Sequence, residues 1–222
     1  MALRPATRFH MHRGHKLKTA PAIEPVTAAE FKAHIVDDGM SDADANAWIE
    51  VARQLIEDNT GIAMISQVWE LTFDRWPSLG GGGWWDGVRE GAMADVHGTP
   101  GAVELPRYPL QDVGAVTTYD TSGAGSPITV ADFFDIDTYS TYGRMSLRYG
   151  ATWPIALRPT NAILIEYTAG YGSAAADVPA PLKLAVKQVA AYLYNHRGDG
   201  CDPKDALAIA GGILGQYKVR SI

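Results

Sequence analysis

The chain has 222 residues, of which 46% are hydrophobic, 20% charged and 9% aromatic. Six Trp, ten Tyr and five Phe need burial, which excludes disorder over the whole length. No stretch approaches the roughly 18 to 20 unbroken apolar residues of a membrane-spanning helix, and no apolar signal-peptide core is visible at the N-terminus. The single Cys201 excludes an intrachain disulfide and a thiolate metal cage. We therefore expect a soluble intracellular protein without a membrane partner.

Charge is distributed unevenly along the chain. Nineteen Lys and Arg stand against 25 Asp and Glu, a formal net charge of −6. Residues 1–23 hold five basic residues and no acid, so the remaining body carries a formal charge of −11. A body of that sign repels nucleic acid. The basic segment is predicted either to contact an anionic partner or to be an unstructured start. Its basic residues are Arg4, Arg8, Arg13, Lys16 and Lys18.

Two helices are predicted after this basic arm. Thr27 and Glu30 have the spacing of a capping box, and the helix that they open would turn Phe31, His34 and Ile35 inward. A second helix begins near Ser41 and ends at Gly61, where glycine favours a C-cap. Its apolar residues recur at helical spacing, which indicates one buried face. These residues are Ala45, Trp48, Ile49, Ala52, Leu55 and Ile56.

The hydrophobic period then changes from helical to alternating. Residues 65–73 alternate between apolar and polar side chains, the pattern of a half-buried strand. Further short strand-like runs follow between Gly and Pro turn signals. These runs are 102–105, 113–119, 128–136, 144–148 and 161–168. Strands at this spacing predict an antiparallel sheet or a small barrel.

Helices return near the C-terminus. Pro179 opens a helix whose inner face is Leu182, Ala185, Val186, Val189, Ala190 and Leu193. Asp202 followed by Pro203 predicts the start of a short helix. Three glycines are expected to end helical structure, and residues 216–222 alternate as an extended tail would. The glycines are Gly211, Gly212 and Gly215.

These elements predict an α+β fold. A helical core is built from the N-terminal and C-terminal helices, and an antiparallel sheet or small barrel is inserted between them in the sequence. We expect a basic arm over residues 1–24 and a single domain over residues 25–222. Within the domain, the segments are helices at 25–62, a β-rich insertion at 63–177, helices at 178–215 and an extended tail at 216–222.

Fragments that resemble catalytic motifs lack the groups that their chemistry requires. Asp120 begins an Asp-Thr-Ser-Gly run, but an aspartic protease needs two carboxylates sharing a proton. The glycines at 80–83 lack the Lys-Ser/Thr of a phosphate loop. Three histidines lie close in sequence without a partner acid, and they are His10, His12 and His15. We therefore predict no enzyme activity, no cofactor and no metal site.

Three tryptophans lie in or beside the Gly-rich segment that follows the first strand. Exposed Trp is common in protein interfaces. The segment is therefore predicted to contact another subunit or a tail-side component, and the alternative is that its tryptophans fold back onto the sheet. The tryptophans are Trp76, Trp84 and Trp85.

The order of short motifs over roughly residues 22–222 resembles the head-tail connector (adaptor) proteins of long-tailed phages and gene transfer agents. The first motifs are Pro25-Val26-Thr27-Ala28-Ala29-Glu30, Ala52-Arg53, Glu57-Asp58-Asn59-Thr60-Gly61, Gln67-Val68-Trp69-Glu70-Leu71 and Leu105-Pro106-Arg107-Tyr108-Pro109-Leu110. The later motifs are Gly143-Arg144, Gly150-Ala151-Thr152-Trp153-Pro154, Tyr167-Thr168-Ala169-Gly170-Tyr171-Gly172, Val178-Pro179-Ala180-Pro181-Leu182-Lys183 and Tyr194-Asn195-His196-Arg197. The segment 76–101 is longer than the family pattern, and the arm before Pro21 is no hallmark of it, so both regions inherit nothing.

The resemblance implies a structural part of a virion, located at the head-tail neck and assembled in the host cytoplasm. Such adaptors form a ring, usually dodecameric, under the portal. They continue the DNA channel, through which DNA passes without sequence-specific binding, and they dock the stopper or tail-completion protein. The rival hypotheses are a small intracellular enzyme with a scattered active site and a nucleic-acid-binding module that acts through the basic arm.

The resemblance also implies a role for the C-terminal tail, because family members grip the portal with this segment. An extended segment of this length cannot form a stable sheet alone, but it can add to another protein's exposed sheet edge. Its two basic residues favour an acidic surface. The predicted portal-binding residues are Tyr217, Lys218, Val219, Arg220, Ser221 and Ile222.

Overall fold

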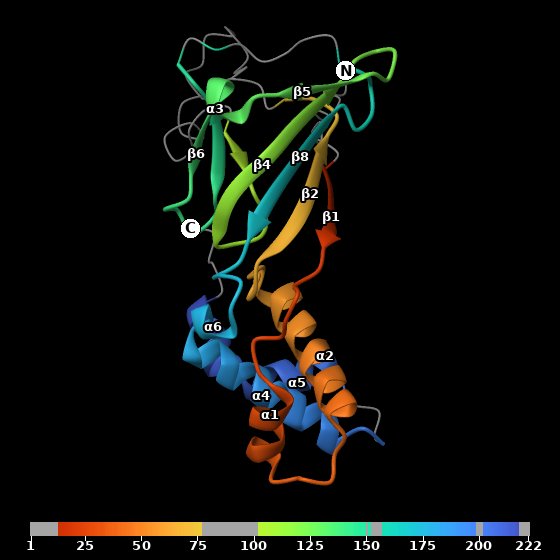
Figure 1. Cartoon of the computed structure of the whole chain (residues 1–222), viewed down its shortest axis with the longest axis vertical. Coiled ribbons are helices and arrows are strands. Elements are labelled where there is room, and N and C mark those ends of the chain that lie inside the picture. Colours follow the sequence, from red (N-terminus) through yellow and green to blue (C-terminus); the bar gives the residue numbers. More distant parts are fainter. Residues whose placement is uncertain (1–12, 77–101, 150, 152–156, 199–201, 218–222) are drawn as a thin grey trace, which may run out of the picture.

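The computed structural model describes residues 13–76, 102–149, 151, 157–198 and 202–217. Figure 1 shows two units stacked along the long axis of the molecule, one made of β-sheets and the other of helices. Each unit has its own cluster of buried hydrophobic residues. The predicted α+β fold, with a β-rich part inserted between helices, is confirmed.

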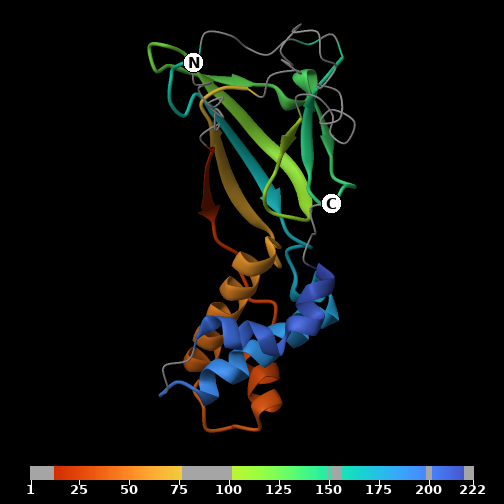
Figure 2. The ribbon, with the colours of Figure 1, turned by 180° about the vertical axis from the view of Figure 1, so that it is seen from behind.

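The helical unit combines elements from both ends of the described chain, and Figure 2 shows them packed together from behind. Its longest helices, α2 and α4, share an apolar core in which Ile49, Ile56, Leu182 and Val186 are all fully buried. The inward faces predicted for these two helices are therefore confirmed. The helices of this unit are α1 (Ala28–Ile35), α2 (Asp42–Thr60), α4 (Ala180–Asn195), α5 (Pro203–Ile209) and α6 (Gly211–Tyr217).

Local signals fix where the first two helices begin and end. The Thr27 hydroxyl accepts from the Glu30 N–H at 3.2 Å, and the Glu30 carboxylate accepts from the Thr27 N–H at 2.8 Å, so the capping box is confirmed. Ser41 caps α2, and Gly61 ends it with φ of 84°, a left-handed conformation that glycine adopts without strain. His34, predicted to face inward from α1, is exposed, whereas Phe31 is buried and Ala28 and Ile35 are partly buried against the helical core.

The sheet unit contains two antiparallel sheets. In the five-stranded sheet, β2 and β8 lie at the centre, and every second residue of both strands is buried. Its strands in order are β1 (Arg13–Thr19), β2 (Gln67–Phe73), β8 (Ile163–Ala169), β4 (Leu110–Tyr119) and β5 (Gly125–Ile128). The three-stranded sheet has the order β3 (Val103–Glu104), β7 (Arg144–Leu147) and β6 (Phe134–Asp137). Residues of both sheets share one apolar interior.

The run 128–136 is not one strand, as the alternation predicted. It contains the end of β5, the one-turn helix α3 (Val130–Phe133) and the start of β6. The short helix lets the chain turn from the five-stranded sheet into the three-stranded one, where Phe134 is buried. Alternation alone cannot show such a turn, because a single helical turn is too short to change the hydrophobic period.

Both ends of the described chain are more regular than predicted. The basic arm was expected to contact a partner or lack structure. Instead, residues 13–19 of the arm form β1, which pairs with β2 along most of the length of β1. At the C-terminal end, Gly211 begins α6 instead of ending the helical region, and α6 extends to Tyr217, inside the predicted tail. Leu214 of α6 is buried in the helical core, and such packing outweighs the low helix propensity of glycine. The 3-10 helix η1 (Ala175–Asp177) precedes α4.

Candidate assembly surfaces

A buried ionic network joins the helical unit to the sheet unit. Arg53 of α2 is 4% exposed and binds both carboxylate oxygens of Glu24, at 2.7 and 3.1 Å. Its third nitrogen donates to Glu57, one helical turn later, at 2.9 Å. The other Glu57 oxygen accepts from the Met64 N–H and the Gln67 amide, both at 2.8 Å. The network therefore ties the segments before α1 and before β2 to the same helix.

The charge state of this network follows from its surroundings. Glu57 is 5% exposed, and burial raises the pKa of its carboxyl. The neighbouring Arg53 charge and three hydrogen bonds act in the opposite direction and favour the ionised form. Removing either partner would leave the other buried without a counter-charge, which makes this pair costly to break.

Arg107 also joins the helical unit to the sheet unit, and we call its contacts the Arg107 clamp. It lies in the segment before β4, and its guanidinium donates to the Glu57 carbonyl at 2.5 Å and to the Asp58 carboxylate at 2.7 Å. The same guanidinium lies 4.5 Å from the centroid of the Trp69 ring, so it also makes a cation–π contact with the sheet. We call Glu24, Arg53, Glu57, Gln67 and Arg107 the junction.

His15 is part of the sheet packing next to this clamp. Its ring stacks on Trp69 with centroids 4.6 Å apart, and its Nε2 lies 2.8 Å from the Tyr167 hydroxyl. Burial, followed by the charges of Arg107 and Arg13, lowers the pKa of His15 to about 4. His10 and His12 lie outside the described residues. Among the described residues, no cluster of three or more His, Cys, Asp or Glu could hold a metal ion.

The described basic residues of the predicted arm contact groups of their own chain. Lys16 forms an ion pair with Glu70 at 2.7 Å. Lys18 hydrogen-bonds Glu166 of β8 and lies 3.8 Å from Glu70. Arg13 donates to the Glu104 carbonyl and lies over the Phe73 ring. The anionic contacts of Lys16 and Lys18 are therefore supplied by Glu70 and Glu166 of the sheet. Arg4 and Arg8 lie outside the described residues.

Trp76 belongs to the core and not to an interface, so that prediction was wrong. It is 7% exposed, and its ring packs against Phe134 with centroids 5.8 Å apart. Trp76 lies three residues after β2, and its ring belongs to the apolar cluster of the sheet unit. Trp84 and Trp85 lie outside the described residues.

The predicted portal-binding tail begins beside the junction. Tyr217 ends α6, and its carbonyl lies 2.8 Å from the Tyr108 hydroxyl, which also lies 2.7 Å from the Thr60 carbonyl at the end of α2. Tyr142 packs edge-on against Tyr108. Tyr217 is therefore held by the helical unit, whereas residues 218–222 lie outside the described residues.

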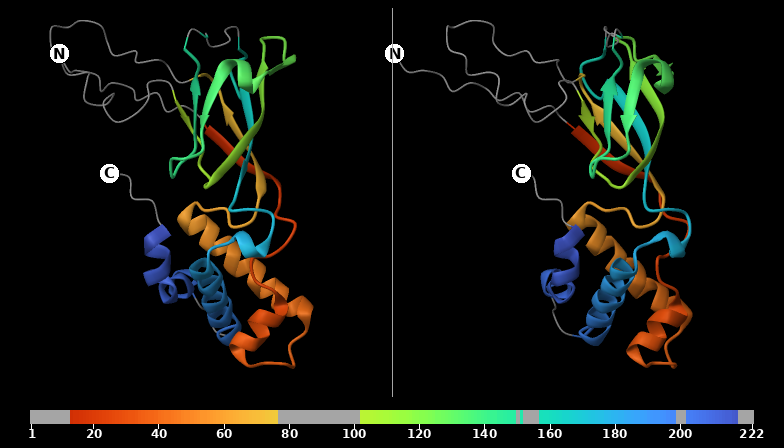
Figure 3. Two further views of the ribbon diagram at one scale, coloured as in Figure 1. Left: turned by 60° about the vertical axis from the view of Figure 1, so that its left-hand side comes forward. Right: turned by 90° about the vertical axis from the view of Figure 1, so that its left-hand side faces the viewer.

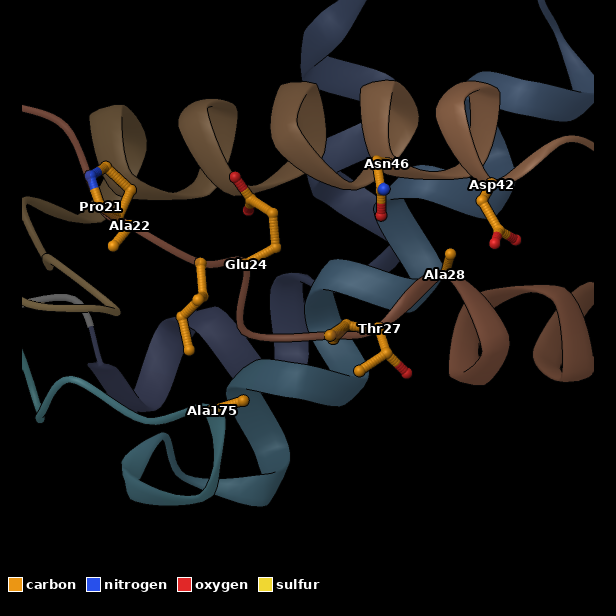
Figure 4. A pocket seen from close by; sticks show the side chains of 10 residues that line it. Pro21, Ala22, Glu24, Thr27, Ala28, Asp42, Asn46 and Ala175 are labelled. Atoms are coloured by element: carbon orange, nitrogen blue, oxygen red, sulfur yellow. The ribbon is translucent and has the colours of Figure 1, made fainter.

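A groove follows α2 on the side of the segment that joins β1 to α1. It consists of two pockets that share Pro21, with volumes of about 570 and 200 Å³. Figure 4 shows Asp42 and Asn46 of α2 projecting toward that segment, with Glu24 on the opposite side. Sequence periodicity identified the buried face of α2 but gave no sign of this groove, because its second wall comes from a different segment.

Among the described helices, none is long and apolar enough to cross a membrane. No protein-family model matches the chain, and no curated protein matches it either.

Solved structures do match the fold. One is a chain from the neck of an empty gene transfer agent particle computed with C6 symmetry, with a TM-score of 0.71, 22% identity, and coverage of 94% of this chain and 97% of that one. A chain from the virion of a native gene transfer agent particle has the same TM-score and coverage at 23% identity. A third, from the native neck with C12 symmetry, has a TM-score of 0.66, 22% identity, and coverage of 93% and 97%. The chain therefore has the fold of these neck chains over nearly its whole length.

Proposed function

We propose that the chain is a structural head-tail connector (adaptor) of a tailed phage or phage-like particle. Copies of it form a ring under the portal, continue the DNA channel and dock the stopper or tail-completion protein. The protein is a virion component of the neck that assembles in the host cytoplasm, and it is not an enzyme. The observation that carries this proposal is the two-way coverage of 94% and 97% with a neck chain of a gene transfer agent particle.

The symmetry of the neck structures that contain these neighbours supports a ring assembly. Two of them come from necks computed with C6 and C12 symmetry. A closed ring is built from head-to-tail contacts, so each copy must present two different complementary faces. We expect twelve copies, the number that the adaptor family typically uses. Trp84 and Trp85 are proposed to lie at a subunit or tail-side contact.

The charge of the body suits a channel for DNA. Outside the basic first 23 residues, the formal charge is −11. An acidic wall opposes lasting contacts with phosphate, so DNA can slide past it. No observation on the described residues favours an enzyme or a nucleic-acid-binding module over the connector.

The tail from Tyr217 to Ile222 is proposed to anchor the ring to the portal. Lys218 and Arg220 supply positive charge, and the intervening Val219 and terminal Ile222 supply apolar contacts. Because Tyr217 is fixed by its contact with Tyr108, the segment that follows leaves from a defined point on the helical unit.

The test is a truncation after Tyr217, which keeps the packed tyrosine and removes only residues 218–222. We expect an unchanged thermal unfolding midpoint and loss of binding to purified portal protein, because the anchor is gone while the core is intact. Lys204→Glu, on the exposed face of α5, is the matched charge control and should bind the portal normally. Electron microscopy of the wild-type chain with its portal should show a ring at the portal, and a wild-type chain that does not bind the portal contradicts the proposed function.

A further inference from the structure

The groove along α2 has one acidic wall. Asp42, Asn46, Glu50, Gln54 and Asp58 recur every four residues, so they form one exposed stripe along the helix. These residues line the two pockets that share Pro21. Counting all lining residues, five acids stand against two arginines, and Lys32 forms an ion pair with Asp42, so the groove keeps a formal excess of two negative charges. The wall therefore attracts a positively charged segment.

The opposite wall carries Glu24, which is bound to Arg53, and is otherwise mainly apolar. It is formed by the segment between β1 and α1, where Ile23 is 42% exposed and Ala22 is also exposed. Figure 3 shows this segment beside α2 from two further directions. A groove with one acidic and one apolar wall fits an extended chain that carries basic and apolar side chains together. A groove without charged side chains would instead fit an apolar segment that has no basic residues.

The chain itself contains such a segment. Residues 1–12 include Arg4 and Arg8 with no acid, together with Leu3, Phe9 and Met11. Arg4 and Arg8 are four residues apart. Fully extended, twelve residues span at most about 40 Å. They enter the described structure at Arg13, the end of β1 farther from the helical unit, while the groove lies beyond the other end of that strand.

We propose that the acidic groove of each copy receives residues 1–12 of a neighbouring copy. The inference rests on the proposed ring and names one of its subunit contacts. Arg13, where the segment joins the described structure, and the groove lie at opposite ends of β1, so the contact is head-to-tail, the kind that closes into a ring. Arg4 and Arg8 contact the stripe of α2, and the apolar side chains between and beside them pack on the wall that contains Ile23.

The test uses full-length chains in a Cys201→Ser background, so that each carries one engineered cysteine. One chain has Phe9→Cys, and the other has Ala22→Cys in the apolar wall. Mixing them under mild oxidation should give a covalent dimer at roughly ten times the yield of a control pair with Ser126→Cys on β5, because docking raises the local concentration. The excess of dimer over the control pair should fall as the salt concentration is raised, because salt screens the exposed charges of the α2 stripe.

Charge reversal provides the specificity control. Asp42→Lys with Glu50→Lys in the groove chain should reduce the dimer roughly tenfold, and Arg4→Glu with Arg8→Glu in the other chain should restore it. Asp132→Lys, on the exposed surface of α3, should have no effect. A yield equal to the Ser126→Cys control, or one that is insensitive to charge reversal, overturns the inference.

Two other occupants give different results. A chain with both Phe9→Cys and Ala22→Cys that closes only within itself shows that the segment binds its own groove, and this overturns the inference. Preferential cross-linking from Ser221→Cys shows that the C-terminal tail occupies the groove, with the same consequence. If the cross-link fails while the wild-type chain binds the portal, only this inference falls. If the wild-type chain does not bind the portal, the proposed function falls, whatever the cross-link yield.

Discussion

The core of the helical unit and the junction above it are both buried, but different interactions hold them. The core brings together aliphatic side chains of α2 and α4, such as Ile49 and Leu182, through contacts that have no preferred direction. The junction consists of charged and amide groups whose hydrogen bonds fix particular atoms at particular positions. The core therefore stabilises the unit by burying apolar surface, whereas the directional bonds of the junction restrict how the helices sit against the sheets.

This difference bears on the proposed connector role. A ring that joins two larger structures has to hold its contact surfaces in a constant relative orientation, and directional bonds restrict orientation better than apolar packing does. The hydrogen bonds of Arg53 and Arg107 both involve the last two turns of α2, after which the chain continues into β2.

Among variants of the junction, the largest loss of stability is expected from Glu57→Ala. It leaves the buried Arg53 without one partner and removes the acceptor of the Met64 N–H and the Gln67 amide, which should cost about 3–5 kcal/mol in the free energy of unfolding. Urea titration measures this loss. Asp58→Ala, the next residue but exposed, should cost less than about 1 kcal/mol. Equal losses in the two variants would show that burial of Glu57 does not increase the cost of removing its carboxylate.

In the apolar core, Leu182→Ala should cost about 3 kcal/mol, because it leaves a cavity at a fully buried site. Leu182→Met should cost less than about 1.5 kcal/mol, because a flexible side chain of similar volume can refill the space. The comparable swap at the junction, Glu57→Gln, should be the more damaging of the two, since it keeps the shape and removes the charge. A junction that tolerates Glu57→Gln and a core that does not tolerate Leu182→Met would contradict this expectation.

The packing of His15 predicts a pH dependence. Its folded-state pKa of about 4 lies below the ordinary value of 6.5, so the unfolded chain binds the proton more strongly. The contribution of His15 to stability is therefore complete above about pH 6.5 and is lost as the pH falls toward 4. Denaturant unfolding of wild type and His15→Gln at several pH values should show the wild-type advantage shrinking over this range. An advantage that is constant with pH contradicts the prediction.

A smaller effect is expected at the start of α2. Ser41→Ala removes the hydroxyl that accepts from the Asp44 N–H at 3.1 Å and should cost about 1 kcal/mol. Ser41→Asp should restore most of this loss, because aspartate caps helices equally well. If Ser41→Asp is as unstable as Ser41→Ala, the cap has no part in stabilising the helix.

The smallest change in stability is expected from the double variant Trp84→Ala and Trp85→Ala. Its melting temperature should stay near that of the wild type while its assembly on the portal falls, because interface aromatics act through association. Trp76→Ala is the matched control and should lower stability by about 3–5 kcal/mol, because this ring fills the core of the sheet unit. A double variant that unfolds as readily as Trp76→Ala would place all three rings in the core.

Several features of the molecule could be predicted because their causes are local in sequence. The inner faces of α2 and α4 follow from apolar side chains at helical spacing, and the Thr27–Glu30 capping box needs only two residues three positions apart. The alternation of β2 and β8 likewise reports which side chains face the interior. None of these requires knowledge of a distant segment.

The amino-acid sequence by itself determined the helical ends, the strand-rich middle and the order of motifs that resembles the connector family. Only the tertiary structure decided what depends on segments far apart in the chain. Glu24 and Arg53 are 29 residues apart, and Asp58 and Arg107 are 49 apart, so no periodicity could pair them. Burial of Leu214 likewise kept α6 helical through its glycines, because packing energy exceeds the local preference of the backbone.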